Sequence, residues 1–157
     1  QAANLIAGFW QNIGVKTNIR FVKARDLTRD VLKTRDYDIL LYGEIIGNDP
    51  DPYPFWHSSQ ATYPGLNLSA YVNRNVDDVI TKIRATRDEK ALGELYGKFQ
   101  DLVLADQPAI FLYMPTYTYA TIDEIQGMGV DKISHPSDRL RDAAGWYMKT
   151  KIDWRFK

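Results

Sequence analysis

The stretch Arg35–Gln60, RDYDILLYGEIIGNDPDPYPFWHSSQ, has two halves of opposite character. Ile39–Tyr42 is an unbroken apolar run, which is typical of a strand buried on both faces. Gly43 ends the run, and a long loop follows that is acidic, aromatic and stiffened by three prolines. Open α/β sheets place their ligands beyond the carboxyl ends of their strands. The stretch therefore predicts an α/β fold with a ligand site in the loop after Tyr42.

The flanking sequence predicts a mixed sheet with flanking helices. Apolar residues recur at helical spacing over 5–13, and Gly14 is placed to end that helix. Alternation over 15–22 predicts a strand, and Asp26 is expected to cap a short helix before the strand at 38–42. Because a strand, a helix and a strand follow at this spacing, the two strands are expected to be parallel.

Two longer helices are expected downstream. Asn75 is expected to cap the first, and Asp88 to open the second, which Pro108 prevents from continuing. The inner face of the first helix is predicted to be Val76, Val79, Ile80 and Ile83. Three further strands are expected, at 109–114, 117–122 and 146–148.

The composition bounds the function. The chain has 157 residues, 45% of them hydrophobic, which is enough for about one domain with a core. Its 20 basic and 20 acidic residues leave no net charge, so no basic surface for nucleic acid is indicated. Without cysteine there is no disulfide or thiol nucleophile, and two histidines exclude a multi-histidine metal site. No cofactor or metal is expected. The helical pattern starts at once, without an initiator Met, which favours a piece of a longer protein.

Four motifs in this order resemble a known family. They are YDILLYG, the DPDPYPFWHSSQ loop, GLNLSAYVNRNVDDVITKIR, and the segment from Leu95-Tyr96 to Tyr113. Together they resemble the C-terminal lobe of extracytoplasmic solute-binding proteins of the peptide/nickel-binding class (family 5), which serve ABC importers. The resemblance covers residues 5 to about 149.

The resemblance implies one lobe of a type II periplasmic-binding-protein fold over 1–149, followed by a tail over 150–157. It implies that the N-terminal lobe is absent from this chain, and that the chain forms one wall of a cleft that captures a solute, oligopeptide above all. The expected partners are that solute, the missing lobe and a membrane permease, with no nucleic acid. The expected location is periplasmic or extracytoplasmic, with membrane association through a part not present here. Relatives often carry tryptophan where this chain has Glu44.

The candidate ligand-binding residues lie in the loop and at two strand ends. They are Glu44, Ile46, Asn48, Asp49, Tyr53, Trp56, His57, Asn67, Tyr71, Tyr113 and Tyr117. Other interpretations stay open for several of them. Asp49 and Asp51 can form turns or caps instead, and the loop aromatics can pack against their own lobe.

Catalysis is not expected. Neighbouring residues such as His57 and Ser58 rarely aim at each other, and no G-x-S-x-G elbow or phosphate-binding glycine loop is present. The D-P-D-P run lacks the ligand spacing of a calcium loop. Two alternatives to solute capture are a protein-interaction domain that uses the Tyr/Trp-rich loop 44–60 and a hydrolase centred on His57.

Overall fold

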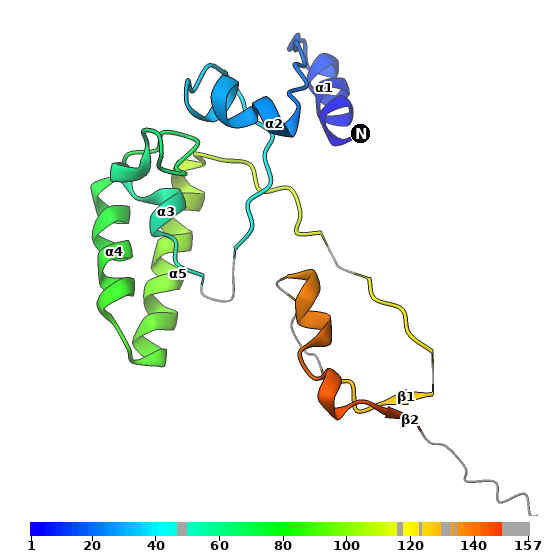
Figure 1. Cartoon of the computed structure of the whole chain (residues 1–157). Helices are drawn as coiled ribbons and strands as arrows, with labels where there is room; N and C mark the ends of the chain where they lie inside the picture. The colour runs from blue at the N-terminus through cyan, green and yellow to red at the C-terminus, as the bar shows by residue number, and fades with distance from the viewer. Residues whose placement is uncertain (47–49, 116–117, 123, 130–132, 134, 149–157) are drawn as a thin grey trace, which may run out of the picture. The chain divides into compact units, whose positions relative to one another are not determined.

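The computed structural model describes residues 1–46, 50–115, 118–122, 124–129, 133 and 135–148. The chain divides into two compact units (Figure 1). Unit 1 comprises Gln1–Glu44 and Asp51–Ile110, and unit 2 comprises Ile45–Pro50 and Phe111–Lys157. Among the described residues, no helix combines the length and the apolar character needed to cross a bilayer.

Unit 1 begins with the predicted helix. α1 (Ala2–Asn12) ends before Gly14, whose φ of 86° confirms the predicted left-handed stop. α2 (Ala24–Leu27) then continues into η1 (Thr28–Leu32), a π-helical turn. The prediction that Asp26 caps this helix was wrong. Its carboxylate lies inside the first turn, where the helix dipole favours an acid, and accepts from Arg29 at 3.1 Å.

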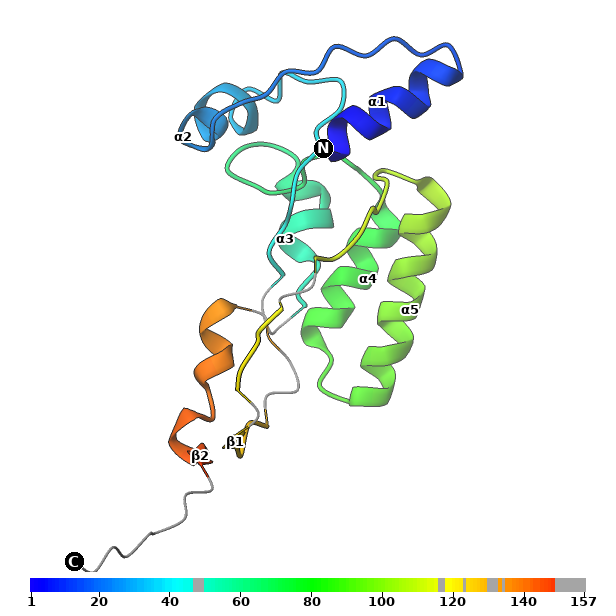
Figure 2. The same cartoon turned by 90° about the vertical axis from the view of Figure 1, so that its right-hand side faces the viewer.

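The core of unit 1 is a block of three helices: α3 (Tyr53–Trp56), α4 (Arg74–Ala85) and α5 (Glu89–Asp106). A short 3-10 turn, η2 (Ser58–Gln60), follows α3. α4 and α5 lie side by side in both views (Figure 2). The predicted inner face of α4 is confirmed, since Val76, Val79, Ile80 and Ile83 are all buried. Each such side chain contributes roughly 1.5–3 kcal/mol to folding.

The ends of these two helices are set by caps. Asp88 opens α5 as predicted, with its carboxylate accepting from the amide of Ala91 at 2.8 Å. The predicted cap of α4 was two residues off: Asn73, not Asn75, is the N-cap. The Asn73 side-chain oxygen accepts from the amides of Asn75 and Val76, at 2.9 and 3.3 Å. Asn73 holds the extended backbone that a cap requires, whereas Asn75 lies inside the helix.

Four of the expected strands are absent over their described residues. The segments 15–22, 38–42 and 110–114 carry no strand, and 118–122 carries none either. Their large apolar side chains are exposed, as at Phe21 and Tyr113, both 76% exposed. An apolar run favours an extended backbone, but a strand forms only where another segment supplies its hydrogen bonds. The described residues supply none here, so the expected parallel pairing of 15–22 with 38–42 is absent.

Unit 2 holds the sheet that is found among the described residues. β1 (Ile125–Gln126) and β2 (Tyr147–Met148) pair antiparallel, with Ile125 opposite Met148. β2 confirms the last predicted strand, while β1 was not predicted. Between them lie two short 3-10 helices, η3 (Pro136–Leu140) and η4 (Ala143–Gly145). A Cβ at Gly127, where φ is 83°, would collide with the carbonyl oxygen of Gly145, so this approach requires glycine.

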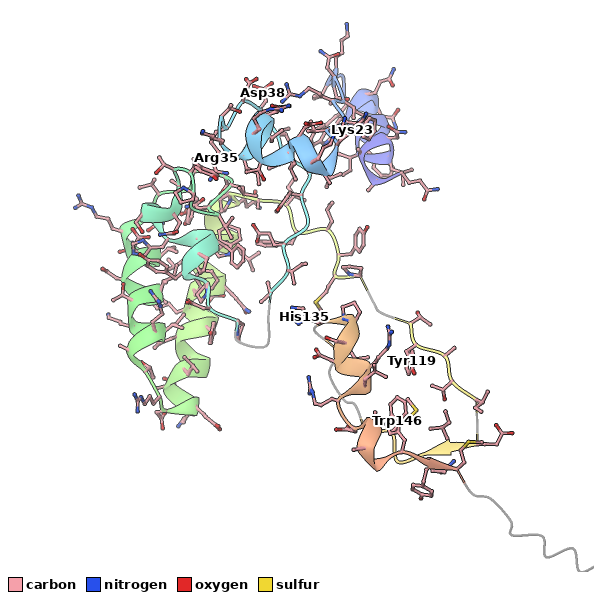
Figure 3. All side chains as sticks on the ribbon, in the orientation of Figure 1. Lys23, Arg35, Asp38, Tyr119, His135 and Trp146 are labelled. Atoms are coloured by element: carbon pink, nitrogen blue, oxygen red, sulfur yellow. The ribbon has the colours of Figure 1, made fainter. Side chains whose placement is uncertain are left out.

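A cation–aromatic contact joins two parts of unit 2. The guanidinium of Arg139 lies 5.7 Å from the ring centre of Tyr119. Figure 3 labels Tyr119 and Trp146 in this unit. Residues 130–144 are largely exposed where the structure describes them.

Candidate functional site

Asp51 is a structural cap just before α3. The Asp51 carboxylate accepts from the Tyr53 amide at 3.0 Å, at the start of α3. Its other oxygen lies 3.4 Å from Nε of Arg84 on α4. The capping interpretation of Asp51 is therefore confirmed, and the loop is tied to α4 at its entrance.

Tyr53 is sandwiched between two side chains of its own unit. The Arg84 guanidinium lies 4.4 Å from the Tyr53 ring centre, and the His57 ring lies 4.5 Å from it. The Tyr53 hydroxyl shares a 3.0 Å hydrogen bond with the Ser59 hydroxyl. The aromatic and polar parts of Tyr53 are thus engaged within the chain, which stabilises the loop on α4.

A single ring nitrogen of His57, Nδ1, faces both Ser59 and Asp77. Nδ1 accepts from the Ser59 amide at 3.1 Å and lies 2.9 Å from the Ser59 hydroxyl. The same atom is 3.9 Å from the carboxylate of Asp77, which itself accepts from the Ser58 amide at 2.8 Å. In a catalytic triad, serine and carboxylate face opposite nitrogens of the imidazole. This arrangement therefore holds a turn together and does not form a triad.

Trp56 packs into the helical block. Its ring meets Tyr71 edge-on at 6.5 Å and Phe99 of α5 at 6.4 Å. It also packs against the buried cluster of Val76, Ile80 and Val103. Edge-to-face pairs contribute about 0.5–1.5 kcal/mol beyond the area that they bury. The packing interpretation of Trp56 is the one that the structure supports.

Asn67 is buried completely, with 0% of its surface exposed. Its amide nitrogen donates to the carbonyls of Tyr71 and His57, at 2.8 and 3.3 Å. Its oxygen accepts from the Tyr71 amide at 3.0 Å and from the Ser69 hydroxyl at 3.3 Å. A buried amide with this set of partners closes the loop on itself. A solute could reach Asn67 only by replacing these bonds.

Tyr71 fastens the end of the loop to α5. Its hydroxyl donates to the Asp106 carboxylate, which also accepts from the Asn73 side chain at 2.7 Å. Desolvation and, second, the bond to Asp106 raise the pKa of Tyr71 to about 12. The bonds from Tyr71 and Asn73 lower the pKa of Asp106. The start of α4 and the end of α5 are thus joined to each other and to the loop through Asp106.

The other candidates are exposed or lie outside the described residues. Glu44 and Ile46 are exposed, and partial desolvation raises the pKa of the Glu44 carboxyl. Tyr113 is 76% exposed in unit 2. Asn48, Asp49 and Tyr117 lie outside the described residues.

The segment Asp38–Glu44, called here the wall segment, is an exposed apolar stretch of unit 1. Its apolar side chains are exposed: Ile39 by 67%, Leu41 by 49% and Tyr42 by 41%. Its backbone makes no backbone hydrogen bond to any other described residue. Unpaired N–H and C=O groups beside apolar side chains are what an added extended strand needs. Among the described residues, no cluster of three or more acidic or histidine side chains could hold a metal ion.

Known proteins resemble the chain over most of its length. It is 26% identical to the oligopeptide-binding protein AppA of Bacillus subtilis over 139 residues, which are 88% of this chain and 25% of that protein. It is 28% identical over 132 residues to a Pseudomonas aeruginosa protein named "Probable di/tripeptide-binding protein 5", covering 82% and 25% of the two. The chain is a partial homologue of these peptide-binding proteins. It spans about a quarter of their length, and no family model matches it.

A solved structure shows the same fold. The structure of AppA from Bacillus subtilis in complex with a nonapeptide matches with a TM-score of 0.69 and 24% identity, over 95% of this chain and 29% of that one. This confirms the expected fold class, one lobe of a type II periplasmic-binding-protein fold. The homologues are named as binding proteins and not as enzymes.

Sequence reasoning missed the residues that hold the loop. Asp77, Arg84 and Asp106 lie in helices and were not among the candidate site residues. Their spacing from the loop carries no pattern that would reveal the pairing. The one available signal was the density of donors in the loop, which needs acceptors when the loop is buried.

Proposed function

We propose that this chain forms one wall of a cleft that captures an oligopeptide for an ABC importer, without catalysing a reaction. The main support is the similarity to an oligopeptide-binding protein over 88% of the chain. We assign residues 1–149 to the C-terminal lobe of that receptor and 150–157 to a tail.

The wall segment is the proposed contact surface. An extended peptide would add as a strand to its unpaired backbone, which gives affinity that depends little on peptide sequence. Leu41 and Tyr42 point to opposite sides of an extended chain, so one of them would flank the peptide and the other would face the lobe. The carboxylate of Glu44 follows directly and is suited to a peptide ammonium group. Tyr113 stays a candidate contact of unit 2.

The remaining parts of the receptor are proposed to lie outside these residues. The opposite wall would be a second lobe, and the lobes would close over the peptide by a hinge motion. The closed form would then deliver the peptide to a membrane permease. We place the receptor in the periplasm or outside the cell, held at the membrane through another part.

The two alternatives have less support. A protein-docking role for loop 44–60 would need free aromatic side chains, yet Tyr53 and Trp56 are packed within unit 1. Hydrolysis centred on His57 would need its two nitrogens to face different partners, whereas Nδ1 faces both Ser59 and Asp77. Both observations favour binding without chemistry.

The test is to titrate the isotope-labelled chain with a mixture of random nonapeptides and follow its amide signals by NMR. We expect shifts over residues 38–46 and a dissociation constant of roughly a millimolar, because one wall supplies only part of the contact. Nanomolar binding by this chain alone, or shifts confined to α4 and α5, would contradict the proposal.

Proline variants sharpen this test. Adjacent amides of a strand point to opposite sides, so either Leu41→Pro or Tyr42→Pro removes a donor that the peptide needs. Leu41→Ala and Tyr42→Ala are the matched controls, since they shorten the side chain but keep the amide. One proline variant is expected to abolish the shifts, whereas equal effects of proline and alanine at both positions would exclude strand addition.

A further inference from the structure

Two side chains connect the start of the wall segment to the loop of the helical block. Nη2 of Arg35 donates to the carbonyl of Gly65 at 2.6 Å. The hydroxyl of Tyr37 donates to the carbonyl of Leu68, also at 2.6 Å. Both bonds are partly buried and join residues about thirty positions apart in the sequence. Figure 3 labels Arg35 at this junction.

The loop that carries the two acceptor carbonyls, Gly65 and Leu68, is stabilised by backbone hydrogen bonds of its own. The Gly65 amide donates to Thr62 at 2.8 Å, and the Asn67 amide to Gln60 at 3.1 Å. A Cβ at Gly65 would collide with the backbone of Gln60, so the loop is closed tightly there. The carbonyls of Gly65 and Leu68 are therefore fixed acceptors on a rigid base.

Arg35, the donor of the bond to Gly65, is itself fixed by a backbone hydrogen bond. The Arg35 amide donates to the carbonyl of Val31 at 2.8 Å, which ends the turn η1. Arg35 has a φ of 56°, a left-handed conformation that arginine seldom adopts. Two other guanidinium nitrogens, Nε and Nη1, are buried without a hydrogen-bond partner among the residues that the structure describes. If this position only needed apolar packing, methionine or leucine would fill it without burying unpaired nitrogens. The hydrogen bond to Gly65 is therefore the contribution that is specific to arginine.

We infer that Arg35 and Tyr37 are positioning residues, which set the direction in which the wall segment leaves the helical block. Neither side chain is needed for contact with the peptide. Asp38, the first residue of the wall segment, follows Tyr37 directly. Holding Tyr37 in place therefore also holds the start of the segment that the peptide would pair with. This inference rests on the proposed function for its consequence in binding, but the geometry of the wall segment can be tested without a peptide.

The experiment measures that geometry and peptide binding separately. Because the chain has no cysteine, Leu41→Cys on the wall segment and Lys98→Cys on α5 can carry two spin labels. Their distance distribution is recorded in Tyr37→Phe, in Arg35→Met and in the double variant. The matched control is Tyr63→Phe, which removes a hydroxyl from the same loop that makes no hydrogen bond among the described residues.

We expect Tyr37→Phe and Arg35→Met each to broaden the distance distribution, and the double variant to broaden it further. Titration with the nonapeptide mixture is expected to weaken by about fivefold for each lost bond. Tyr63→Phe is expected to change neither readout. If the distribution of the double variant matches that of the parent chain, the inference is wrong whatever the binding data show. If it broadens while no variant, nor the parent, binds peptide, the positioning role stands and the proposed function fails.

Discussion

Replacing Asn67 by alanine separates a structural role from a ligand-binding role. The substitution removes a fully buried amide that serves the Tyr71 carbonyl at 2.8 Å and the Tyr71 amide at 3.0 Å. Each of these two backbone groups would lose its partner in a partly buried place, at about 1–2 kcal/mol apiece. The longer bonds to His57 and Ser69, both 3.3 Å, add less. We therefore expect Asn67→Ala to destabilise unit 1 by about 2–4 kcal/mol.

The assay is native-state hydrogen exchange of the Ile80 amide, read by NMR, because Ile80 lies in the buried core of α4. Asn67→Leu keeps the branched shape but not the hydrogen bonds, so it is expected to cost nearly as much. Ser69→Ala, which removes one 3.3 Å bond, should cost less than about 1 kcal/mol. If Asn67→Ala stays within about 0.5 kcal/mol of the parent and only weakens peptide binding, the structural account of Asn67 is wrong.

Three further outcomes follow from caps and titrating groups. Asn73→Ala should destabilise α4 by about 1 kcal/mol, whereas Asn75→Ala should be close to neutral; urea unfolding followed by circular dichroism separates them, and equal losses would refute the assigned cap. Tyr71 has its pKa raised to about 12 and Asp106 has its pKa lowered, so their pair stabilises the fold below the ordinary tyrosine value of about 10 and above the ordinary aspartate value of about 3.9. That stability is lost as pH rises through about 12 and as pH falls through the lowered Asp106 value; in Tyr71→Phe, carbon-detected NMR should find the Asp106 pKa moved upward, and an unchanged Asp106 titration would count against the bond. Desolvation raises the Glu44 pKa, so the ionised carboxyl is disfavoured in the fold and Glu44→Gln should not lower stability at neutral pH; a clear drop in the urea midpoint would contradict this.

Local signals in the sequence were sufficient for the three long helices α1, α4 and α5. The spacing of Val76, Val79, Ile80 and Ile83 predicted the buried face of α4 because a helical repeat brings such residues to one side. Gly14 and Asp88 marked helix ends through conformational freedom and side-chain capping. The cap of α4 was misassigned because two asparagines lie two residues apart, and either can cap.

The candidate site was predicted only in part. The sequence indicated a polar, aromatic loop after Tyr42, and the structure has one. It left open whether Trp56 and Tyr53 pack within the lobe or contact a ligand, since an aromatic side chain suits either role, and the structure shows both packed within unit 1. The wall segment, which ends at Glu44, is the exposed part of the candidate site. Its apolar side chains are exposed, and its backbone makes no backbone hydrogen bond to any other described residue.

The sequence by itself determined the positions of the long helices, the order of motifs and the resemblance to a family, because each depends on residues close together in the chain. The tertiary structure decided which side chains of the loop hold the lobe together, because the partners Asp77, Arg84 and Asp106 come from distant helices. It also decided that the apolar runs at 15–22 and 38–42 pair with no other segment among the described residues. Hydrophobicity favours burial, but strand pairing depends on which other segment is present to accept and donate the backbone hydrogen bonds.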